Sequence, residues 1–188
     1  MKKRYVMLMD MAKCVGCSAC AIACKAENAT PEGASRNWIV EETEGAYPDL
    51  RMTIRSERCH HCSDAPCVEA CPTGASHYGP GGTVMIDKDL CTGCRVCMAS
   101  CPYGARYVHP EGHVDKCTFC MHRVEKGLDP ACVTNCPTHS LHFGDVNEPE
   151  SEVATLLRVR DHEVLHAEVG TRPNLYFLTD DRSSRRSA

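Results

Sequence analysis

The chain has 188 residues, 16 of them cysteines, and this share lies within the roughly 8–10 % band typical of chains organised by cross-links or metals. Its formal net charge of −4 gives no basic field for nucleic acid, and no apolar run approaches the roughly 20 residues of a membrane helix. The apolar run Tyr5–Met9 is too short for a secretory signal. We therefore expect no nucleic-acid partner, no direct membrane span and no export signal.

Short strands and helices are expected between the cysteines. Apolar alternation indicates strands, and apolar residues three or four apart indicate helices. The run Gly79-Pro80-Gly81-Gly82 predicts a tight turn, and the polar tail from 180 to 188 is expected to lack order. The predicted elements are a strand over 5–10, a helix over 18–27, strands over 38–40 and 50–54, the turn at 79–82, helices over 118–127 and 130–135, a strand over 141–144, a helix over 152–160 and a strand over 176–178.

The cysteines fall into four sets of four with none left over. The first and third sets share the spacing C-x2-C-x2-C-x3-C, and proline follows every set except the first, where Lys25 stands. The sets are Cys14, Cys17, Cys20 and Cys24; Cys59, Cys62, Cys67 and Cys71; Cys91, Cys94, Cys97 and Cys101; and Cys117, Cys120, Cys132 and Cys136.

Three kinds of site compete for these cysteines. Disulfides suit small secreted chains, but C-x2-C-x2-C would give each thiol several alternative partners. Structural zinc usually takes two C-x2-C pairs separated by a longer spacer. In paired 4Fe-4S clusters, three closely spaced cysteines bind one cluster and the fourth, followed by proline, binds the neighbouring cluster. We therefore expect four 4Fe-4S clusters, and a zinc-organised interaction module is the alternative from another class.

The order of the sets predicts the domain organisation. The second and third sets are neighbours in sequence, so they can form a continuous two-cluster module with the turn at 79–82 between its halves. The first and fourth sets lie at opposite ends, and each needs a neighbour for its fourth cysteine. We expect an α+β fold of two ferredoxin-like modules, one inserted in the other: an outer module over 1–54 plus 111–179 and an inserted module over 55–110.

Full cysteine ligation also predicts the chemistry. Sixteen cysteines for four clusters leave no iron free to bind a substrate, so we expect a non-catalytic electron carrier. Each oxidised cluster carries about −2, which would bring the chain to about −12. His60 and His61 are expected beside a cluster or at the surface, not as ligands. Five cations are expected either to offset the cluster charge or to be solvated: Arg58, Arg95, Arg106, Lys116 and Arg123.

The motifs resemble a known family. The sequence is similar to the four-cluster electron-transfer subunits of molybdopterin oxidoreductases, and most of all to polysulfide and thiosulfate reductase iron-sulfur subunits. The resemblance runs over nearly the whole chain and stops at the tail. The segments that carry it are Met11–Cys20 (MAKCVGCSAC), Cys62–Cys67 (CSDAPC), Cys71–Ala75 (CPTGA), Cys101–Ala105 (CPYGA), Lys116–Cys120 (KCTFC) and Gly170–Pro173 (GTRP).

The resemblance implies a ligand set for each cluster. Some relatives carry Trp at the position of Cys94 and bind a three-iron cluster there, so cysteine at this position implies a four-iron cluster. The implied sets are Cys14, Cys17, Cys20 and Cys136 nearest the molybdopterin subunit; then Cys117, Cys120, Cys132 and Cys24; then Cys59, Cys62, Cys67 and Cys101; and last Cys91, Cys94, Cys97 and Cys71.

The resemblance also implies partners. The chain would relay single electrons between a membrane quinol-oxidising subunit and a molybdopterin catalytic subunit. An electron-relay subunit of a formate dehydrogenase or hydrogenase is the alternative. The implied location is peripheral, on the periplasmic side of a membrane-associated complex after export with the catalytic subunit, and cytoplasmic residence is the alternative.

Overall fold

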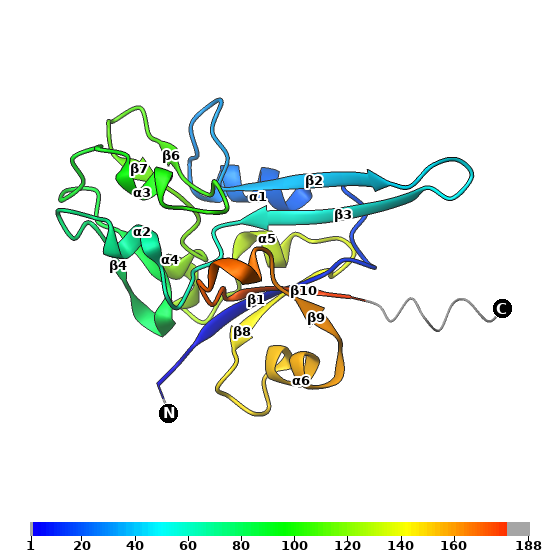
Figure 1. Ribbon diagram of the computed structural model, residues 1–188. Helices are drawn as coiled ribbons and strands as arrows, with labels where there is room; N and C mark the ends of the chain where they lie inside the picture. Colours follow the sequence, from blue (N-terminus) through cyan, green and yellow to red (C-terminus); the bar gives the residue numbers. More distant parts are fainter. Residues whose placement is uncertain (1, 180–188) are drawn as a thin grey trace.

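The computed structural model describes residues 2–179 and centres on a four-stranded mixed sheet in the order β8-β1-β10-β9. Strand β1 (Tyr5–Asp10) pairs in parallel with β10 (Leu175–Leu178) and antiparallel with β8 (Leu141–Asp145). The short β9 (His162–Glu163) pairs with β10. This sheet therefore joins the two ends of the described chain side by side (Figure 1).

Strand β1 is buried on both faces. Val6 and Leu8 pack with Val153 of helix α6 (Glu152–Val159) on one face. Met7 and Met9 belong to the larger core that contains many of the cysteines on the other. Covering both faces removes a run of apolar side chains from water, which stabilises the central strand of the sheet.

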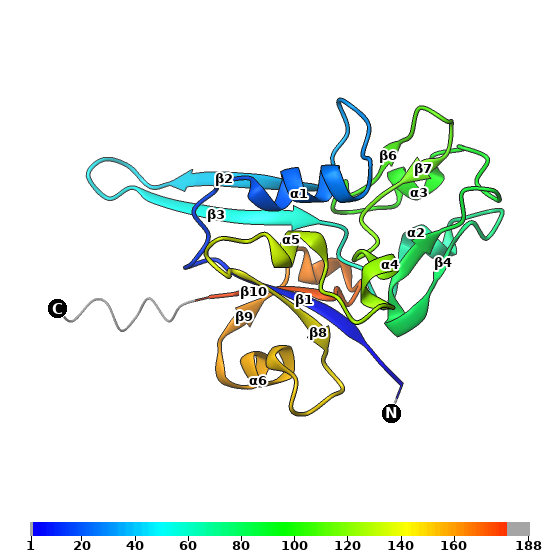
Figure 2. The same ribbon diagram turned by 180° about the vertical axis from the view of Figure 1, so that it is seen from behind.

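A long two-stranded hairpin lies beside the sheet. Strands β2 (Asn37–Glu44) and β3 (Arg51–Arg58) pair antiparallel, and their far end extends beyond the rest of the fold (Figures 1 and 2). Helix α1 (Ala19–Glu27) runs next to β2 and contacts the short helix α5 (Ala131–Thr134). The near end of β3 reaches the cysteine-rich core, where Ser56, Glu57 and Arg58 are buried.

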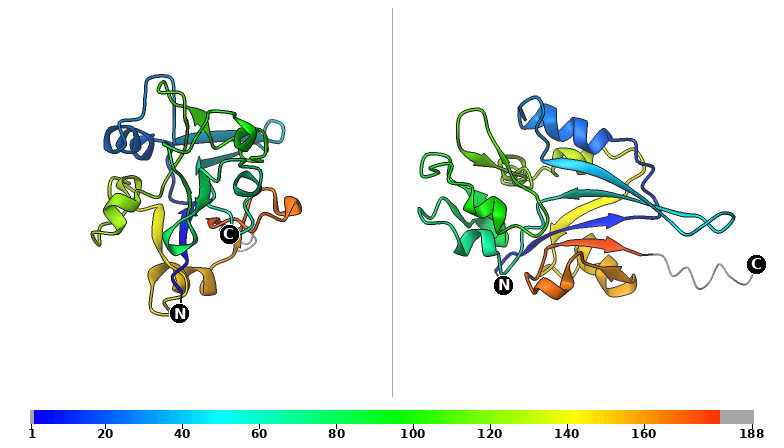
Figure 3. Two further views of the ribbon diagram at one scale, coloured as in Figure 1. Left: turned by 90° about the vertical axis from the view of Figure 1, so that its left-hand side faces the viewer. Right: turned by 45° about the horizontal axis from the view of Figure 1, so that its top comes forward.

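Small elements and loops gather at the opposite end of the molecule from the hairpin tip (Figures 1 and 3). Such short elements cannot bury enough side chains to be stable alone, so their packing depends on the cysteines between them. They are α2 (Pro66–Glu69), β4 (Ser76–Tyr78), the 3-10 turn η1 (Pro80–Gly82), β5 (Val84–Ile86), α3 (Val96–Ala99), β6 (Tyr107–Val108), β7 (Val114–Asp115) and α4 (Met121–Val124). A second 3-10 turn, η2 (Ala167–Val169), precedes β10.

The sequence predictions for the mixed α and β content, the strand over 5–10 and the turn at 79–82 are confirmed. The helix predicted over 118–127 is wrong, because Phe119 and Cys120 have φ values of 53° and 51° and only Met121–Val124 is helical. The strand predicted at 38–40 is part of the longer β2, and the one predicted at 50–54 corresponds to β3, which begins one residue later and extends to Arg58. The tail from 180 to 188, expected to lack order, lies outside the described residues. Within 2–179, no helix combines the length and apolar character needed to cross a bilayer.

Candidate metal centres

The sixteen cysteines are all free thiols, and ten of them are buried. Cys17 and Cys94 are the exposed members of the set. Two hollows each bring together three cysteines of one sequence set and one cysteine of another set. The other eight cysteines, seven of them buried, are described below as a third and a fourth group.

The first hollow lies between α1, the hairpin and α5. It has a volume of about 280 Å³, and Cys136 from the fourth set lines it together with three cysteines of the first set. The Ser140 backbone N–H donates to Cys136 Sγ at 3.3 Å, and Cys20 Sγ lies 3.4 Å from Ser56 Oγ. The cysteines that line it are Cys14, Cys17, Cys20 and Cys136.

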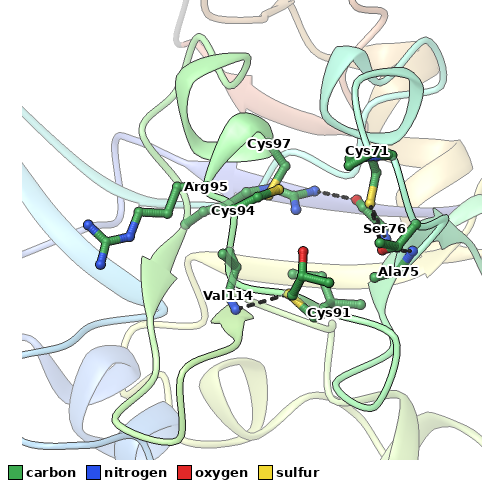
Figure 4. A pocket seen from close by; sticks show the side chains of 13 residues that line it. Cys71, Ala75, Ser76, Cys91, Cys94, Arg95, Cys97 and Val114 are labelled. Carbon is green, nitrogen blue, oxygen red and sulfur yellow. Dashed lines mark hydrogen bonds between the residues drawn. The ribbon is translucent and has the colours of Figure 1, made fainter.

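The second hollow lies at the other end of the molecule and has a volume of about 320 Å³. Its sulfurs face a shared space, and Arg95 points away from them (Figure 4). The Ser76 backbone N–H donates to Cys71 Sγ at 3.3 Å and that of Val114 to Cys91 Sγ at 3.4 Å. The cysteines that line it are Cys71, Cys91, Cys94 and Cys97.

The third group consists of Cys24, Cys117, Cys120 and Cys132, all buried. Burial raises the pKa of the Cys24 thiol to about 12, with further upward contributions from Cys132 and Cys120. The pKa of Cys117 is raised first by burial and then by Cys24. Asn28 Nδ2 lies 3.7 Å from the sulfurs of both Cys24 and Cys120, which ties α1 to the distant loop.

The fourth group consists of Cys59, Cys62, Cys67 and Cys101. Burial raises the pKa of the Cys62 thiol to about 12, and the sulfurs of the other three members also raise it. Such thiols are protonated at neutral pH when no metal is present. Binding of iron therefore requires release of these protons, so metal loading and pH are coupled.

The spacing of the sulfurs tests the zinc alternative. In a tetrahedral zinc site with Zn–S bonds of about 2.3 Å, the sulfurs lie about 3.8 Å apart. Across residues 2–179, no three cysteine sulfurs lie within 4.8 Å of one another. The cysteine groups are thus too wide for a single zinc ion, and they suit a polynuclear centre that spans a larger gap.

The cysteine loops share a backbone conformation. Gly16 and Gly93 both have φ of 69°, and the residues after the second cysteines, Ser18 and Arg95, have φ of 60° and 64°. Left-handed residues within a loop turn successive N–H groups toward one side and create a concave anion site. The backbone N–H of Phe119, with φ of 53°, donates to Cys117 Sγ at 3.4 Å. The loops therefore place N–H donors beside the sulfurs.

Three buried cations lie at successive junctions between the groups. Arg58 is 0 % exposed and donates from Nη1 to Cys132 Sγ at 3.0 Å; burial disfavours its charge, but sulfurs including those of Cys132 and Cys20 raise its pKa. It thus lies between the first hollow and the third group.

The other two junctions are built in the same way. Lys116, 1 % exposed, donates from Nζ to the carbonyl oxygen of Val84 and to that of Cys117, the latter at 2.7 Å. Burial raises the pKa of the Cys67 thiol, and the positive charge of Lys116 acts against that rise. Arg106, 7 % exposed, donates from Nη2 to Cys67 Sγ at 2.8 Å. Burial, the largest single effect, lowers the pKa of Arg106, but nearby sulfurs, including Cys97 of the second hollow, raise it overall. These contacts place the groups in the order first hollow, third group, fourth group, second hollow.

The remaining charged residues and histidines singled out from the sequence have different surroundings. Arg95 is exposed, and Arg123 pairs with Glu27 at 3.0 Å, so neither offsets charge among the buried sulfurs. His60 and His61 are 1 % and 0 % exposed, so the surface alternative for them is wrong. Each stacks on an aromatic ring at 3.7 Å, His60 on Tyr103 and His61 on Phe119. Burial, the largest cause, lowers the pKa of His60 to about 3 and keeps it neutral.

Three further polar residues that were not expected from the sequence lie beside the sulfurs: Asn28, Ser56 and Ser140. Asn28 follows Cys24 by four residues, which is one helical turn, and this spacing was an available signal. Ser140 also follows Cys136 by four residues, but no helix connects them, so this spacing gave no signal. Ser56 had no such signal, because its position depends on how β3 passes the first hollow.

Comparison with known proteins agrees with this geometry. A family model described as a 4Fe-4S dicluster domain matches residues 50–146, and a second model with the same description matches residues 13–75. Together the two matches cover all sixteen cysteines. The fold and the sites thus define a protein with two dicluster domains that hold four 4Fe-4S clusters.

Individual relatives identify the family. Protein NrfC of Escherichia coli is 44 % identical, over 92 % of this chain and 79 % of its own length. A tetrathionate reductase subunit of Salmonella typhimurium is 40 % identical, over 94 % and 73 %. The arsenate respiratory reductase iron-sulfur subunit of a Shewanella species is 34 % identical, over 93 % and 96 %. The chain belongs to the molybdopterin oxidoreductase iron-sulfur subunit family, as a non-catalytic electron-transfer subunit.

Proposed function

We propose that this chain relays single electrons between a membrane quinol-oxidising subunit and a molybdopterin catalytic subunit of the polysulfide or thiosulfate reductase type. The proposed location is the periplasmic side of a membrane-associated complex. The family membership supports the catalytic partner, and the similarity of the cysteine motifs supports the sulfur-compound type. The order of the four cysteine groups supports a linear relay, because the first and last groups line hollows that lie at opposite ends of the molecule.

We also propose that each group of four cysteines holds one cluster, within two interleaved modules over 1–54 plus 111–179 and over 55–110. The observation that carries this proposal is the exchange of cysteines between sets: Cys136 lines the first hollow and Cys71 lines the second. The same exchange places Cys24 beside Cys132 and Cys101 beside Cys62. Disulfides or isolated metal sites within one sequence set would not require it.

The residues around the sulfurs have separate tasks. When bound, each cluster supplies a one-electron couple whose potential depends on charge and hydrogen bonds around its sulfurs. The backbone N–H groups of Phe119, Ser140 and Val114 donate to those sulfurs. Arg58, Lys116 and Arg106 supply positive charge where two groups meet, and the apolar core around them excludes water.

The ligand assignment is tested by a double-variant cycle in the purified complex, followed by redox titration with electron paramagnetic resonance. Cys24→Ser and Cys117→Ser should change the same cluster, so their effects should not add. Cys24→Ser and Cys14→Ser should change different clusters, and their effects should add. Additive effects for the first pair and non-additive effects for the second would refute the exchange of cysteines.

The partner assignment is tested on the complex isolated from its native membrane. We expect molybdenum or tungsten in a co-purifying large subunit, reduction of the bound clusters by a quinol, and turnover with polysulfide or thiosulfate. Nickel in the partner would indicate a hydrogenase and contradict the proposal. Turnover with arsenate or tetrathionate alone would contradict the substrate type while leaving the family membership intact.

A further inference from the structure

A small cluster of metal-binding side chains lies outside the cysteine groups, on the turn between β6 and β7. His109 Nδ1 lies 3.6 Å from Glu111 Oε2, and His113 Nδ1 lies 3.8 Å from the same oxygen. One donor atom from each residue lies within 4.8 Å of both others. The two imidazole rings are stacked, with centroids 4.5 Å apart and planes 18° apart.

The local sequence builds this arrangement. The Gly112 N–H donates to the His109 carbonyl at 2.8 Å, and the His109 N–H donates to the His113 carbonyl at 2.8 Å. Pro110 takes the second position of the four-residue turn and Gly112, with φ of 92°, takes the last, as the residue preferences of tight turns favour. Closing the turn places His109 and His113 opposite each other at the turn end of the hairpin, with Glu111 between them.

We propose that His109, Glu111 and His113 form a site for a divalent transition-metal ion of the Zn²⁺ type. Imidazole and carboxylate are ligands that zinc accepts, and two histidines with one glutamate are a known zinc donor set. With bonds of about 2.0–2.1 Å, tetrahedral donors lie about 3.3 Å apart. Closing this site therefore requires the two stacked rings to turn until both Nδ1 atoms point at one ion beside Glu111.

The surroundings leave these donors accessible to a metal. The side chains of His109 and His113 are 22 % and 15 % exposed, and that of Glu111 is 68 % exposed. The Glu111 backbone N–H donates to His109 Nδ1 at 3.3 Å, a long contact that keeps this nitrogen an acceptor. A metal would replace that contact. Three protein ligands leave a fourth position for water or for a donor atom of another molecule.

The position of the hairpin connects the site to the rest of the fold. The Gly112 carbonyl oxygen lies against Gly93 in the loop of the second hollow, and the Val114 N–H donates to Cys91 Sγ at 3.4 Å. A metal that joins His109 to His113 would hold the turn end of this hairpin closed. The expected consequence is slower hydrogen exchange of the hairpin amides over residues 107–115 when the metal is bound.

The test uses the cluster-loaded protein, stripped of adventitious metal and given one equivalent of Zn²⁺ under anaerobic conditions. We expect one zinc per chain with Zn–N and Zn–O distances of about 2.0–2.2 Å by X-ray absorption, and no Zn–S distance of about 2.3 Å. His113→Ala should weaken zinc binding by more than about 100-fold. Loss of a residue that only hydrogen-bonds to a metal ligand would weaken it by about 10–100-fold. Glu111→Gln, which keeps the shape of the turn, should also weaken it.

The matched control is His122→Ala, which removes an exposed histidine that pairs with Glu27 at 2.8 Å. It should leave zinc affinity and hairpin exchange unchanged. Iron content measured in every variant shows whether the fold is intact. A sulfur shell around zinc, or equal binding by the wild type, His113→Ala and Glu111→Gln proteins, would overturn the proposed site.

Discussion

Arg58 Nη1 donates a hydrogen bond to Cys132 Sγ at 3.0 Å, and this guanidinium is fully buried between the first hollow and the third cysteine group. A buried cation favours the more negative, reduced state of a nearby redox centre, since charges interact strongly away from water. Arg58 is therefore positioned to raise the reduction potentials of two adjacent clusters at once.

Removing this charge should lower those potentials. For a one-electron couple, a loss of about 1.4 kcal/mol in the stability of the reduced state lowers the reduction potential by about 59 mV. Arg58→Gln removes the stabilising charge. We expect falls of this order for two clusters, with smaller changes in Arg58→Lys, which keeps the charge. Redox titration with electron paramagnetic resonance measures them. Arg158→Gln, an exposed change on α6, is the control, and equal shifts in both glutamine variants would contradict this role for Arg58.

The second hollow offers a change in cluster type. Cys94 is exposed and its side chain faces the hollow (Figure 4). Cys94→Trp removes one of four ligands, so we expect about one iron fewer per chain and a cluster of higher potential. Iron analysis and low-temperature electron paramagnetic resonance of the oxidised protein check this. A spectrum identical to that of the wild type would show that Cys94 is not a ligand.

The contact between Gly93 and Gly112 predicts a difference between two glycine substitutions. A Cβ on Gly93 would lie 2.3 Å from the Gly112 carbonyl oxygen, whereas a Cβ on Gly82 meets nothing within 4 Å. Both glycines have positive φ, 69° and 73°, so both alanine variants incur a backbone strain of about 1–2 kcal/mol. Gly93→Ala must also displace the hairpin, and we expect a larger fall in its anaerobic Tm. Equal falls in Tm would argue against this close packing.

Asp115 joins the β6-β7 hairpin to the loop after α1. Its Oδ2 accepts hydrogen bonds from Arg36 Nη2 at 2.6 Å and from the Tyr107 hydroxyl. Burial is the largest single effect and raises the pKa of Asp115. The contacts with Tyr107 and Arg36 together outweigh it and hold that pKa below the ordinary value. Asp115→Asn should therefore destabilise the protein at neutral pH by about 2–3 kcal/mol.

The pH dependence of that loss follows from the lowered pKa. The stabilisation by ionised Asp115 is fully present above the unfolded pKa of about 4 and disappears as the pH falls through the lower folded value. Thermal unfolding of wild type and variant at several pH values measures the difference. Asp64→Asn, which breaks the exposed pair with Arg172, is the control and should change Tm little. A loss that is the same at every pH would exclude the ionic contribution.

The sequence predicted those features that depend on local spacing. The strand over Tyr5–Asp10 followed from its apolar residues. The positions of Cys136 and Cys71 beside cysteines of another set agree with the expectation that the fourth cysteine of a set serves the neighbouring cluster. The helix predicted from Thr118 failed because Phe119 and Cys120 adopt left-handed backbone conformations beside the sulfurs. Hydrophobic periodicity carries no information about such conformations, which the cysteine loop imposes.

The roles of the charged residues depended on tertiary structure. Arg58, Lys116 and Arg106 were among five candidates that sequence could not separate from Arg95 and Arg123. What separates them is burial at places where distant segments meet, and that is a property of the assembled fold. His109 and His113 differ in this respect, because a local four-residue turn brings them face to face.

The most direct test of the account is the ratio of iron, acid-labile sulfide and zinc in protein purified without exposure to oxygen. We expect a brown protein with about four irons and four sulfides for every four cysteines, whether or not zinc occupies the hairpin. A colourless protein that contains zinc, no sulfide and no iron would contradict it.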